Sequence, residues 1–284
     1  MDNKSKKSNS RKKKIWLLYA LMGICIVAVI VFAVLLGTDL YTNWQSQSYY
    51  SNLSDGIETR PRPTGGPRPT QGATDSGDDT GEEAPDVQEI IWEPYVDFEA
   101  LNERFPGVVG WIKLDGTPID YPIMQYTDND FFLDRLPDGT SHRSGSIFLD
   151  YSNNPDFSDR VIALYGHAMR TQDMFGSLKN FREQKFYEEH PVAHIYTPTA
   201  DYELVLIAGY RVPASEPPPF TFGDDEAFLR HIESIKRRSS ENYFVSDVEV
   251  GPDDRIVNLC TCTYEFENAR LIIVGKLVVI SEPH

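Results

Sequence analysis

One uncharged apolar run near the start of the chain limits what this sequence can form. The run IWLLYALMGICIVAVIVFAVLLG spans residues 15–37 and contains no charged side chain. About 20 helical residues are enough to cross the roughly 30 Å hydrocarbon core of a bilayer. A cleaved signal peptide has a shorter apolar region of about 7–15 residues, followed by a small-residue cleavage site that is missing here. The run therefore predicts a retained transmembrane anchor.

The charges on either side of this run predict its orientation. The segment 1–14 before it holds seven Lys or Arg and one Asp, and the segment 38–58 after it holds no Lys or Arg. Short basic segments stay in the cytoplasm by the positive-inside rule. We therefore expect a single-pass protein of the cell membrane, with residues 1–14 as a cytoplasmic basic tail and the chain beyond residue 37 outside the cell.

Beyond the basic tail the chain is strongly acidic. The formal net charge of the whole chain is −16, although the segment 1–14 is basic. An acidic surface repels phosphate backbones, which argues against nucleic acid as a partner. Three cysteines are too few for a disulfide framework, so stability must come from packing. With 40% hydrophobic and 12% aromatic residues, the chain has enough apolar surface for a core.

Residues 38–87 are predicted to be an extracellular tether. Between about Tyr41 and Asp86 the composition changes, and RPRPTGGPRPTQGATDSGDDTGEEAP consists mainly of Pro, Gly, Thr and acidic residues. Such a segment has little to bury, and its Arg-Pro-Thr repeats favour extended polyproline conformations. This leaves residues 88–284 as one domain held away from the membrane.

Short β-rich runs separated by turn signals dominate residues 88–284 and predict eight strands. The runs are Val108–Leu114, Ile119–Gln125, Ser146–Asp150, Val161–Tyr165, His194–Thr197, Tyr202–Val212, Arg255–Cys262 and Leu271–Ile280. Asp97 is the expected N-cap of a short helix through Arg104, and further helices are predicted at Met174–Glu189 and Asp224–Arg238. Eight strands with few helices favour a closed barrel or a sandwich.

Cys260 and Cys262 are the only cysteines outside the apolar run, and they lie near the end of a predicted strand. Residues two apart in a strand point to the same face, with Cα atoms about 6.5–7 Å apart, at the limit for a relaxed disulfide. Zinc sites usually use Cys-x₂₋₄-Cys spacing and a second pair, which is missing in the sequence. The position suits a nucleophile, but on spacing alone a structural role stays open.

His167 and Arg270 are the candidate partners of Cys262. His167 follows the β-run VIALYGHAM, in which Gly166 is expected to give the backbone freedom at the strand exit. A seven-residue connection joins Cys262 to Arg270, so a hairpin would put the guanidinium beside the thiol. Taken alone, a structural histidine and a solvated arginine are the simpler interpretations.

Taken together, these residues resemble the signature of the class B sortases, the cysteine transpeptidases of Gram-positive cell surfaces. That signature is Thr-Leu-x-Thr-Cys at the end of strand seven, an arginine on strand eight and a histidine after strand four. Here Asn258-Leu259-Cys260-Thr261-Cys262 matches at Leu, Thr and Cys and departs at Asn258 and Cys260. The segments VGWIKLDGTPIDYPIMQ, GSIFLDY, LYGHAM and TCTYEFENARLIIVGKL extend the resemblance colinearly over residues 95–284.

The resemblance implies a mostly β fold, an eight-stranded sortase-type β-barrel. It also implies an N-terminal helical segment, an extra helix before strand seven and one preceding transmembrane helix. It implies Cys262 as the nucleophile, His167 as the general acid and base, and Arg270 as the donor to the oxyanion. No metal or other cofactor is implied, and no clustered carboxylate site of the kind used by calcium-dependent class A sortases is found in the sequence.

The partners implied by the resemblance are secreted surface proteins that carry a C-terminal sorting motif, and an amine of a peptidoglycan precursor or a pilin lysine. Two alternatives remain open. A secreted cysteine protease would use the same Cys and His chemistry but release its product to water. A non-catalytic tethered surface-binding domain would leave Cys262 inert.

Cys260 is the most informative departure from the family pattern. It lies one pair further into the strand than Cys262, so we expect it to be buried among apolar groups, with a raised pKa and little reactivity. The competing hypothesis is a redox switch in which the two cysteines pair after oxidation, which strand geometry makes strained.

Overall fold

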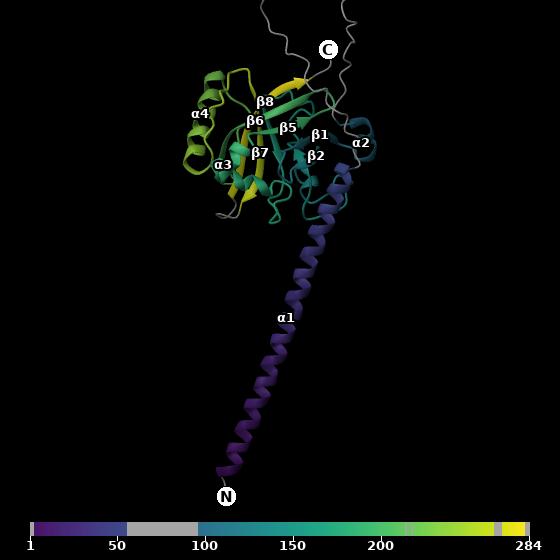
Figure 1. Cartoon of the computed structure of the whole chain (residues 1–284), viewed down its shortest axis with the longest axis vertical. Helices are drawn as coiled ribbons and strands as arrows, with labels where there is room; N and C mark the ends of the chain where they lie inside the picture. Colours follow the sequence, from purple (N-terminus) through teal and green to yellow (C-terminus); the bar gives the residue numbers. More distant parts are fainter. Residues whose placement is uncertain (1–2, 56–95, 214, 217, 264–268, 282–284) are drawn as a thin grey trace, which may run out of the picture. The chain divides into compact units, whose positions relative to one another are not determined.

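The computed structural model describes residues 3–55, 96–213, 215–216, 218–263 and 269–281. The chain divides into two compact units, Met1–Ser51 and Asn52–His284 (Figure 1). In chain order the helices and strands are α1 (Asn3–Asp55), α2 (Phe98–Arg104), β1 (Val108–Lys113), β2 (Asp120–Met124), η1 (Phe131–Leu133), β3 (Ile147–Leu149), β4 (Val161–Tyr165), η2 (Gly176–Arg182), α3 (Gln184–Glu189), β5 (Val192–Tyr196), β6 (Asp201–Pro213), α4 (Asp225–Asn242), β7 (Arg255–Thr263) and β8 (Ala269–Ser281).

Helix α1 is longer than the anchor predicted at residues 15–37. It continues to Asp55, so residues 38–55 of the expected tether are helical rather than extended. The physical reason is that residues 38–55 contain neither proline nor glycine, so nothing in them stops the helix. The rest of the expected tether, and the first residues of the expected catalytic domain at 88–95, lie outside the described residues.

The apolar part of α1 leaves its side chains exposed. Within the described part of the chain, Leu21–Leu53 is the one helical stretch long and apolar enough to cross a membrane. Ile24, Phe32 and Leu35 are each more than 60% exposed. Large apolar surface of this kind is unfavourable in water and favourable in lipid. The helix is therefore consistent with a membrane anchor.

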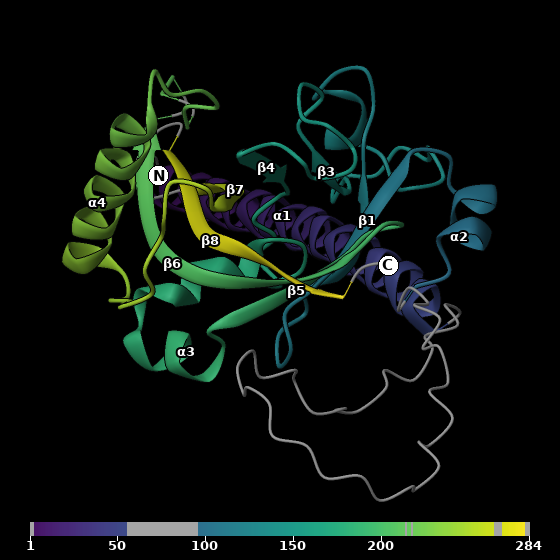
Figure 2. The ribbon, with the colours of Figure 1, turned by 90° about the horizontal axis from the view of Figure 1, so that it is seen from above.

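The strands of the second unit close into a barrel with the order β1-β2-β3-β4-β7-β8-β6-β5 (Figure 2). Neighbouring strands are antiparallel except for β2 with β3 and β4 with β7, which are parallel. This confirms the predicted eight-stranded barrel. All eight predicted strands are present, with bounds within two residues of those read from the sequence.

Two predicted helices are confirmed by their caps. The Asp97 carboxylate accepts from the Ala100 N–H at 3.0 Å at the start of α2. The Asp224 carboxylate accepts from the Ala227 N–H at 2.7 Å at the start of α4, the expected extra helix before strand seven. Helix α4 continues one turn past the predicted end at Arg238, to Asn242.

The single helix predicted at Met174–Glu189 is wrong. The segment forms the 3₁₀ turn η2 and the short helix α3, separated by Glu183 in an extended conformation. Leu178 and Phe181 are fully buried and three positions apart, a spacing that a 3₁₀ turn places on one face. The extended conformation of Glu183 ends this turn before α3 begins.

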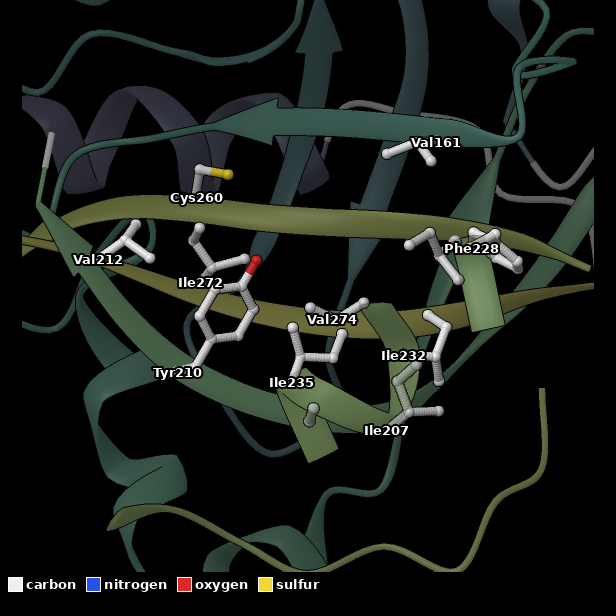
Figure 3. Close-up of a cluster of buried hydrophobic side chains, with 12 residues drawn as sticks. Val161, Ile207, Tyr210, Val212, Phe228, Ile232, Ile235, Cys260, Ile272 and Val274 are labelled. Atoms are coloured by element: carbon white, nitrogen blue, oxygen red, sulfur yellow. The ribbon is translucent and has the colours of Figure 1, made fainter. Parts of the chain in front are cut away.

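Helix α4 covers the outside of the barrel at β6 (Figure 2). Its apolar side chains pack with residues of β6, β7 and β8 in one buried cluster (Figure 3). That cluster contains Phe228, Ile232 and Ile235 of α4, Ile207, Tyr210 and Val212 of β6, Ile256 and Cys260 of β7, and Ile272 and Val274 of β8. The helix thus packs on β6, and its apolar side chains share a buried cluster with Ile256 and Cys260 of β7.

A buried serine links the last turn of α4 to the barrel by hydrogen bonds. The Ser239 hydroxyl donates to the Phe244 carbonyl at 2.6 Å and accepts from the Gly209 N–H of β6 at 2.9 Å. Ser239 is 1% exposed, so water cannot replace either partner.

We predict that Ser239→Ala lowers the free energy of unfolding by about 1–3 kcal/mol, because two buried backbone groups lose their partner. Chemical unfolding of the full chain in detergent, followed by Trp fluorescence, measures the change. Ser240→Ala is the matched control, since the exposed Ser240 hydroxyl bonds only within the helix, to Arg237. Equal effects of the two substitutions would contradict this assignment.

Candidate active site

The parallel pairing of β4 with β7 aligns the segments that carry His167 and Cys262. Tyr165 lies opposite Cys260, and the Gly166 N–H donates to the Cys260 carbonyl at 3.1 Å. Both strands run in the same direction from this pair. His167 and Cys262, each two positions further on, therefore lie at the same end of the barrel.

The antiparallel pairing of β7 with β8 adds Arg270. Cys262 is the register partner of Arg270, and Arg270 also pairs with Val212 of β6. The fold thus brings the backbones of the three predicted site residues together. The side chain of Cys262 and residues 264–268 of the β7–β8 connection lie outside the described part of the structure.

The His167 side chain is held by the main chain of a distant loop. Its Nε2 lies 2.7 Å from the Leu133 carbonyl oxygen. The His167 carbonyl accepts from the Phe175 N–H at 3.0 Å, which fixes the backbone on the other side. The imidazole is therefore oriented although it is partly exposed.

Gly166, directly before His167, is needed for space rather than for backbone freedom. It is not among the glycines with positive φ, which corrects the sequence-based expectation. A Cβ at this position would overlap the Ile147 side chain and come within 2.9 Å of the Phe175 ring. Close packing of β3 and the segment after β4 explains the glycine.

Cys260 is buried, as expected. It is 2% exposed and packs against Tyr210 and Ile272 in the cluster beneath α4 (Figure 3). Burial raises the pKa of the Cys260 thiol to about 12, while the nearby Arg270 cation acts in the opposite direction. This thiol is therefore protonated at neutral pH.

Asn258 stands where the family signature has threonine, and it joins the two strands of the site. Its Nδ2 donates to the Ile162 carbonyl of β4 at 3.4 Å, and its side chain is buried. The amide therefore adds a side-chain link to the β4–β7 pairing.

Asp150, to which the sequence analysis gave no role, organises the edge of the site. It follows β3, is 4% exposed, and its Oδ2 accepts from the Tyr165 hydroxyl at 3.1 Å and from Asn129 Nδ2 at 2.9 Å. Burial raises the pKa of Asp150, but hydrogen bonds from Ser152, Asn129 and Tyr165 outweigh it, so the pKa lies below its usual value. An acidic residue closing the apolar run SIFLD was the available sequence signal.

Tyr165 connects this carboxylate to the rest of the site. Burial raises its pKa, the neighbouring Cys260 and Asp150 raise it further, and Arg270 lowers it. Arg270 therefore acts electrostatically on both Tyr165 and Cys260. The Arg270 cation is therefore close to the pairing of Tyr165 with Cys260.

His231 lies on α4. It is half-buried, its ring contacts Phe222 at 5.3 Å between centroids, and burial lowers its pKa, with Arg238 contributing. Among the described residues no group of three or more His, Cys, Asp or Glu is arranged to hold a metal ion.

Comparison with known proteins gives a consistent result. No protein-family model matches the chain. Sortase B of Listeria monocytogenes serovar 1/2a is 34% identical over 185 residues, covering 64% of this chain and 73% of the relative. Sortase B of Staphylococcus aureus is 32% identical over 187 residues, covering 65% and 75%.

Solved structures agree with the sequence relatives. Sortase B from Bacillus anthracis in complex with AAEK1 has a TM-score of 0.66 at 28% identity, covering 86% of this chain and 99% of that one. The Staphylococcus aureus sortase B–substrate complex has a TM-score of 0.61 at 31% identity, covering 65% and 85%. Sortase B complexed with triglycine has a TM-score of 0.60 at 31% identity, covering 65% and 86%.

A closed mixed barrel with a helix before its seventh strand is the architecture of a cysteine transpeptidase. At this identity and coverage, the chain belongs to the sortase B family. The fold and the enzyme class predicted from the sequence are both confirmed.

We predict that Asp150→Asn destabilises the fold in a pH-dependent way. A carboxylate whose pKa is lowered by folding contributes stability above its unfolded pKa of about 4, and this contribution is lost as the pH falls through the folded pKa. The difference in unfolding free energy between wild type and variant should therefore be larger at about pH 7 than at about pH 3. Denaturant unfolding at both pH values measures it.

The control for this experiment is Asp253→Asn, since Asp253 is an exposed carboxylate. Its effect should be small at both pH values. A wild-type advantage over Asp150→Asn that grows on acidification contradicts the assignment.

We predict that Cys260 resists alkylation in the folded chain and reacts after unfolding. With a pKa of about 12, only about one thiol in 10⁴ is ionised at pH 8. Iodoacetamide treatment followed by peptide mass mapping measures the modified fraction under native and denaturing conditions. Native labelling at the rate of a free cysteine, or a reversible Cys260–Cys262 disulfide that blocks activity after mild peroxide, contradicts burial as the controlling factor.

Proposed function

We propose that this protein is a membrane-anchored sortase. It cleaves a sorting motif near the C-terminus of secreted proteins and joins the resulting acyl group to an amine of a cell wall precursor. The observation that carries the proposal is the strand register, in which Tyr165 pairs with Cys260 and Cys262 pairs with Arg270. This register supports a site built from His167, Cys262 and Arg270.

Cys262 is the nucleophile. A free thiol has a pKa of about 8.5 and is only a few per cent thiolate at neutral pH, and nearby cations favour the ionised form. The thiolate attacks the carbonyl of a threonine in the sorting motif and forms a thioacyl-enzyme. Cys260 does not compete, because it is buried and protonated.

His167 transfers protons in both half-reactions. It protonates the amine that leaves when the peptide bond breaks, and it deprotonates the incoming amine before the thioester is cleaved. The hydrogen bond from its ring to the Leu133 carbonyl supports an orientation fixed before substrate binds.

Arg270 stabilises the negative charge that develops on the carbonyl oxygen. A preorganised guanidinium can donate to both the substrate carbonyl and the oxyanion of the tetrahedral intermediate. Its electrostatic effect on Tyr165 and Cys260 supports a cation facing this end of β7.

The acceptor amine belongs to a peptidoglycan precursor. A complex of sortase B with triglycine, a short peptide with a free amine, supports a glycine-type acceptor for this chain as well. The substrate complex of the Staphylococcus aureus enzyme supports a peptide acyl donor. A pilin lysine is the other acceptor used in the wider family, and it presents the same primary amine.

The apolar part of α1 anchors the enzyme, with residues 1–14 in the cytoplasm, 15–37 in the membrane and the barrel outside. Trp16 and Trp44 are 28 positions apart, about 42 Å along a helix at 1.5 Å per residue. This matches the about 40–45 Å of a bilayer with its headgroup regions, where Trp and Tyr concentrate. Residues 38–87 are the spacer and residues 88–284 the catalytic domain.

We predict that Cys262→Ala abolishes both acyl-enzyme and product. His167→Ala and Arg270→Ala should each lower turnover by about 10²–10⁴-fold, because each removes a group that acts in the transition state. The assay uses the full chain in detergent with a peptide library built on Asn-Pro, Leu-Pro and Ser-Pro motifs. Product is resolved by mass spectrometry with and without triglycine.

Cys260→Ser is the matched control and should retain most activity. Triglycine should accelerate peptide consumption and appear in an amide product. Full activity of any one of the three alanine variants removes that residue from the mechanism, and acid product alone at high triglycine makes the enzyme a hydrolase.

We also predict that a truncated chain beginning at Gln88 is soluble, monomeric and active on peptides, because residues 60–85 before it consist mainly of Pro, Gly, Thr and acidic residues with little apolar surface to bury. Size-exclusion chromatography and the peptide assay measure this. Aggregation or loss of activity in the short chain, with full activity in a chain beginning at Thr38, contradicts the spacer assignment.

A further inference from the structure

We propose that the main-chain carbonyl of Leu133 is the positioning group of His167. It fixes Nε2 as the ring nitrogen that carries hydrogen and leaves Nδ1 to exchange protons with the substrate. Gly145 is the residue that makes room for this carbonyl. The inference deepens the proposed function and rests on His167 acting as its acid and base.

The assignment of the tautomer follows from the chemistry of the contact. His167 Nε2 lies 2.7 Å from the Leu133 carbonyl oxygen, and a carbonyl oxygen can only accept. Nε2 must therefore donate in both the neutral and the cationic ring. In the neutral ring the lone pair is on Nδ1, so Nδ1 is the atom that gains and loses the proton.

The carbonyl is held by a loop that folds back on itself. After η1, the His142 N–H donates to the Asp134 carbonyl at 2.8 Å and the Leu136 N–H donates to the Thr140 carbonyl at 2.9 Å, which makes a small hairpin with its tip at Gly139. At the base of the hairpin the Ser146 N–H donates to the Phe132 carbonyl at 2.9 Å.

The side chains of Arg135 and Ser146 stabilise the same loop. Arg135 Nη1 donates to the Phe131 carbonyl at 3.2 Å, and its guanidinium lies 4.7 Å from the centroid of the Phe131 ring. The Ser146 hydroxyl donates to the Arg135 carbonyl at 2.7 Å. The turn that presents the Leu133 carbonyl to His167 is therefore built from several hydrogen bonds and is not a loose surface loop.

Gly145 is the point at which this arrangement depends on the sequence. Its φ is +56°, and a Cβ there would overlap the Leu133 carbonyl oxygen and come within 2.8 Å of the Phe132 carbonyl oxygen. Any larger residue must push away the carbonyl that holds His167. Gly139 has a similar conformation, with φ of +81°, but open space around it.

The proton steps balance with Nδ1 as the exchanging atom. When the C–N bond of the tetrahedral intermediate breaks, the Nδ1 proton of the imidazolium moves to the leaving amine and the ring becomes neutral. When the acceptor amine attacks the thioester, Nδ1 takes a proton from it, the C–S bond breaks and Cys262 leaves as thiolate. Nε2–H stays bonded to Leu133 throughout, so the ring does not rotate between the two halves.

The direct test is the tautomer of His167 in the resting enzyme. The full chain, labelled with ¹⁵N-histidine, is studied in detergent by multiple-bond ¹H–¹⁵N correlation, and His167 is assigned by the signal that His167→Ala removes. We expect the neutral ring to show protonated Nε2 and unprotonated Nδ1. A neutral ring that is mainly protonated at Nδ1 overturns the proposal.

The second test compares two glycine variants that introduce the same methyl group at positive φ. Gly145→Ala should reduce the Nε2–H tautomer signature and lower kcat by about 10–100-fold, as expected for a small misplacement of an acid–base group, with little change in KM. Gly139→Ala, which has a similar conformational cost at the hairpin tip, should leave both kcat and the tautomer unchanged. Equal kcat values for the two variants overturn the positioning role.

These readouts separate the inference from the proposed function. The tautomer is measured without turnover, so the inference fails on a wrong tautomer even in an active sortase. The proposed function fails if His167→Ala keeps full activity, whatever tautomer His167 adopts. If Gly145→Ala does not fold, the wild-type tautomer alone decides.

Discussion

The parallel pairing of β4 with β7 is the constraint on which the site depends. The two strands are distant in the sequence, since Ile162 and its hydrogen-bonded partner Asn258 are 96 positions apart. Both strands are buried on both faces, since the adjacent residues Ile256 and Val257 are fully buried, and a slip of one residue would give every one of these core side chains new neighbours. Such a slip would also separate His167 from Cys262. The same strand register therefore determines both the packing of the barrel core and the alignment of the site.

Strand β7 changes environment along its length. Its first part and Cys260 lie beneath α4 in an apolar cluster, where burial keeps a thiol protonated. Two positions further on, Cys262 pairs with Arg270 at the strand end. Cys260 is therefore kept protonated by burial in a cluster to which α4 contributes Phe228, Ile232 and Ile235.

Much of the fold could be predicted from the sequence because it depends on local patterns. The eight strands are marked by β-rich runs between turn signals, and α4 is marked by the Asp224 cap and by the spacing of Phe228, Ile232 and Ile235. The division at residues 174–189 could not be predicted, because it follows from the burial of Phe181 in the finished fold. Helix α1 is longer than composition indicates, because residues 38–55 contain neither proline nor glycine to end it.

Some parts of the site could likewise be predicted from the sequence, and others could not. Arg270 could be placed beside Cys262 from the short connection between their strands, whereas His167 could be assigned to the same site only through the family resemblance. The Leu133 carbonyl could not, because every residue has one and only the folded loop brings this one to His167. Asp150 likewise gains its partners Tyr165 and Asn129 from tertiary structure.

The measurement that tests the account most directly is the position of the covalent intermediate. The full chain is mixed with an intact sorting peptide that it cleaves, and the reaction is quenched in acid before any amine is added. The protein is then digested, and its peptides are fragmented by tandem mass spectrometry. The account predicts an acyl group ending in threonine on Cys262, with Cys260 in the same fragment unmodified. Acylation of Cys260, or complete peptide cleavage with no acyl group on either thiol, would contradict it.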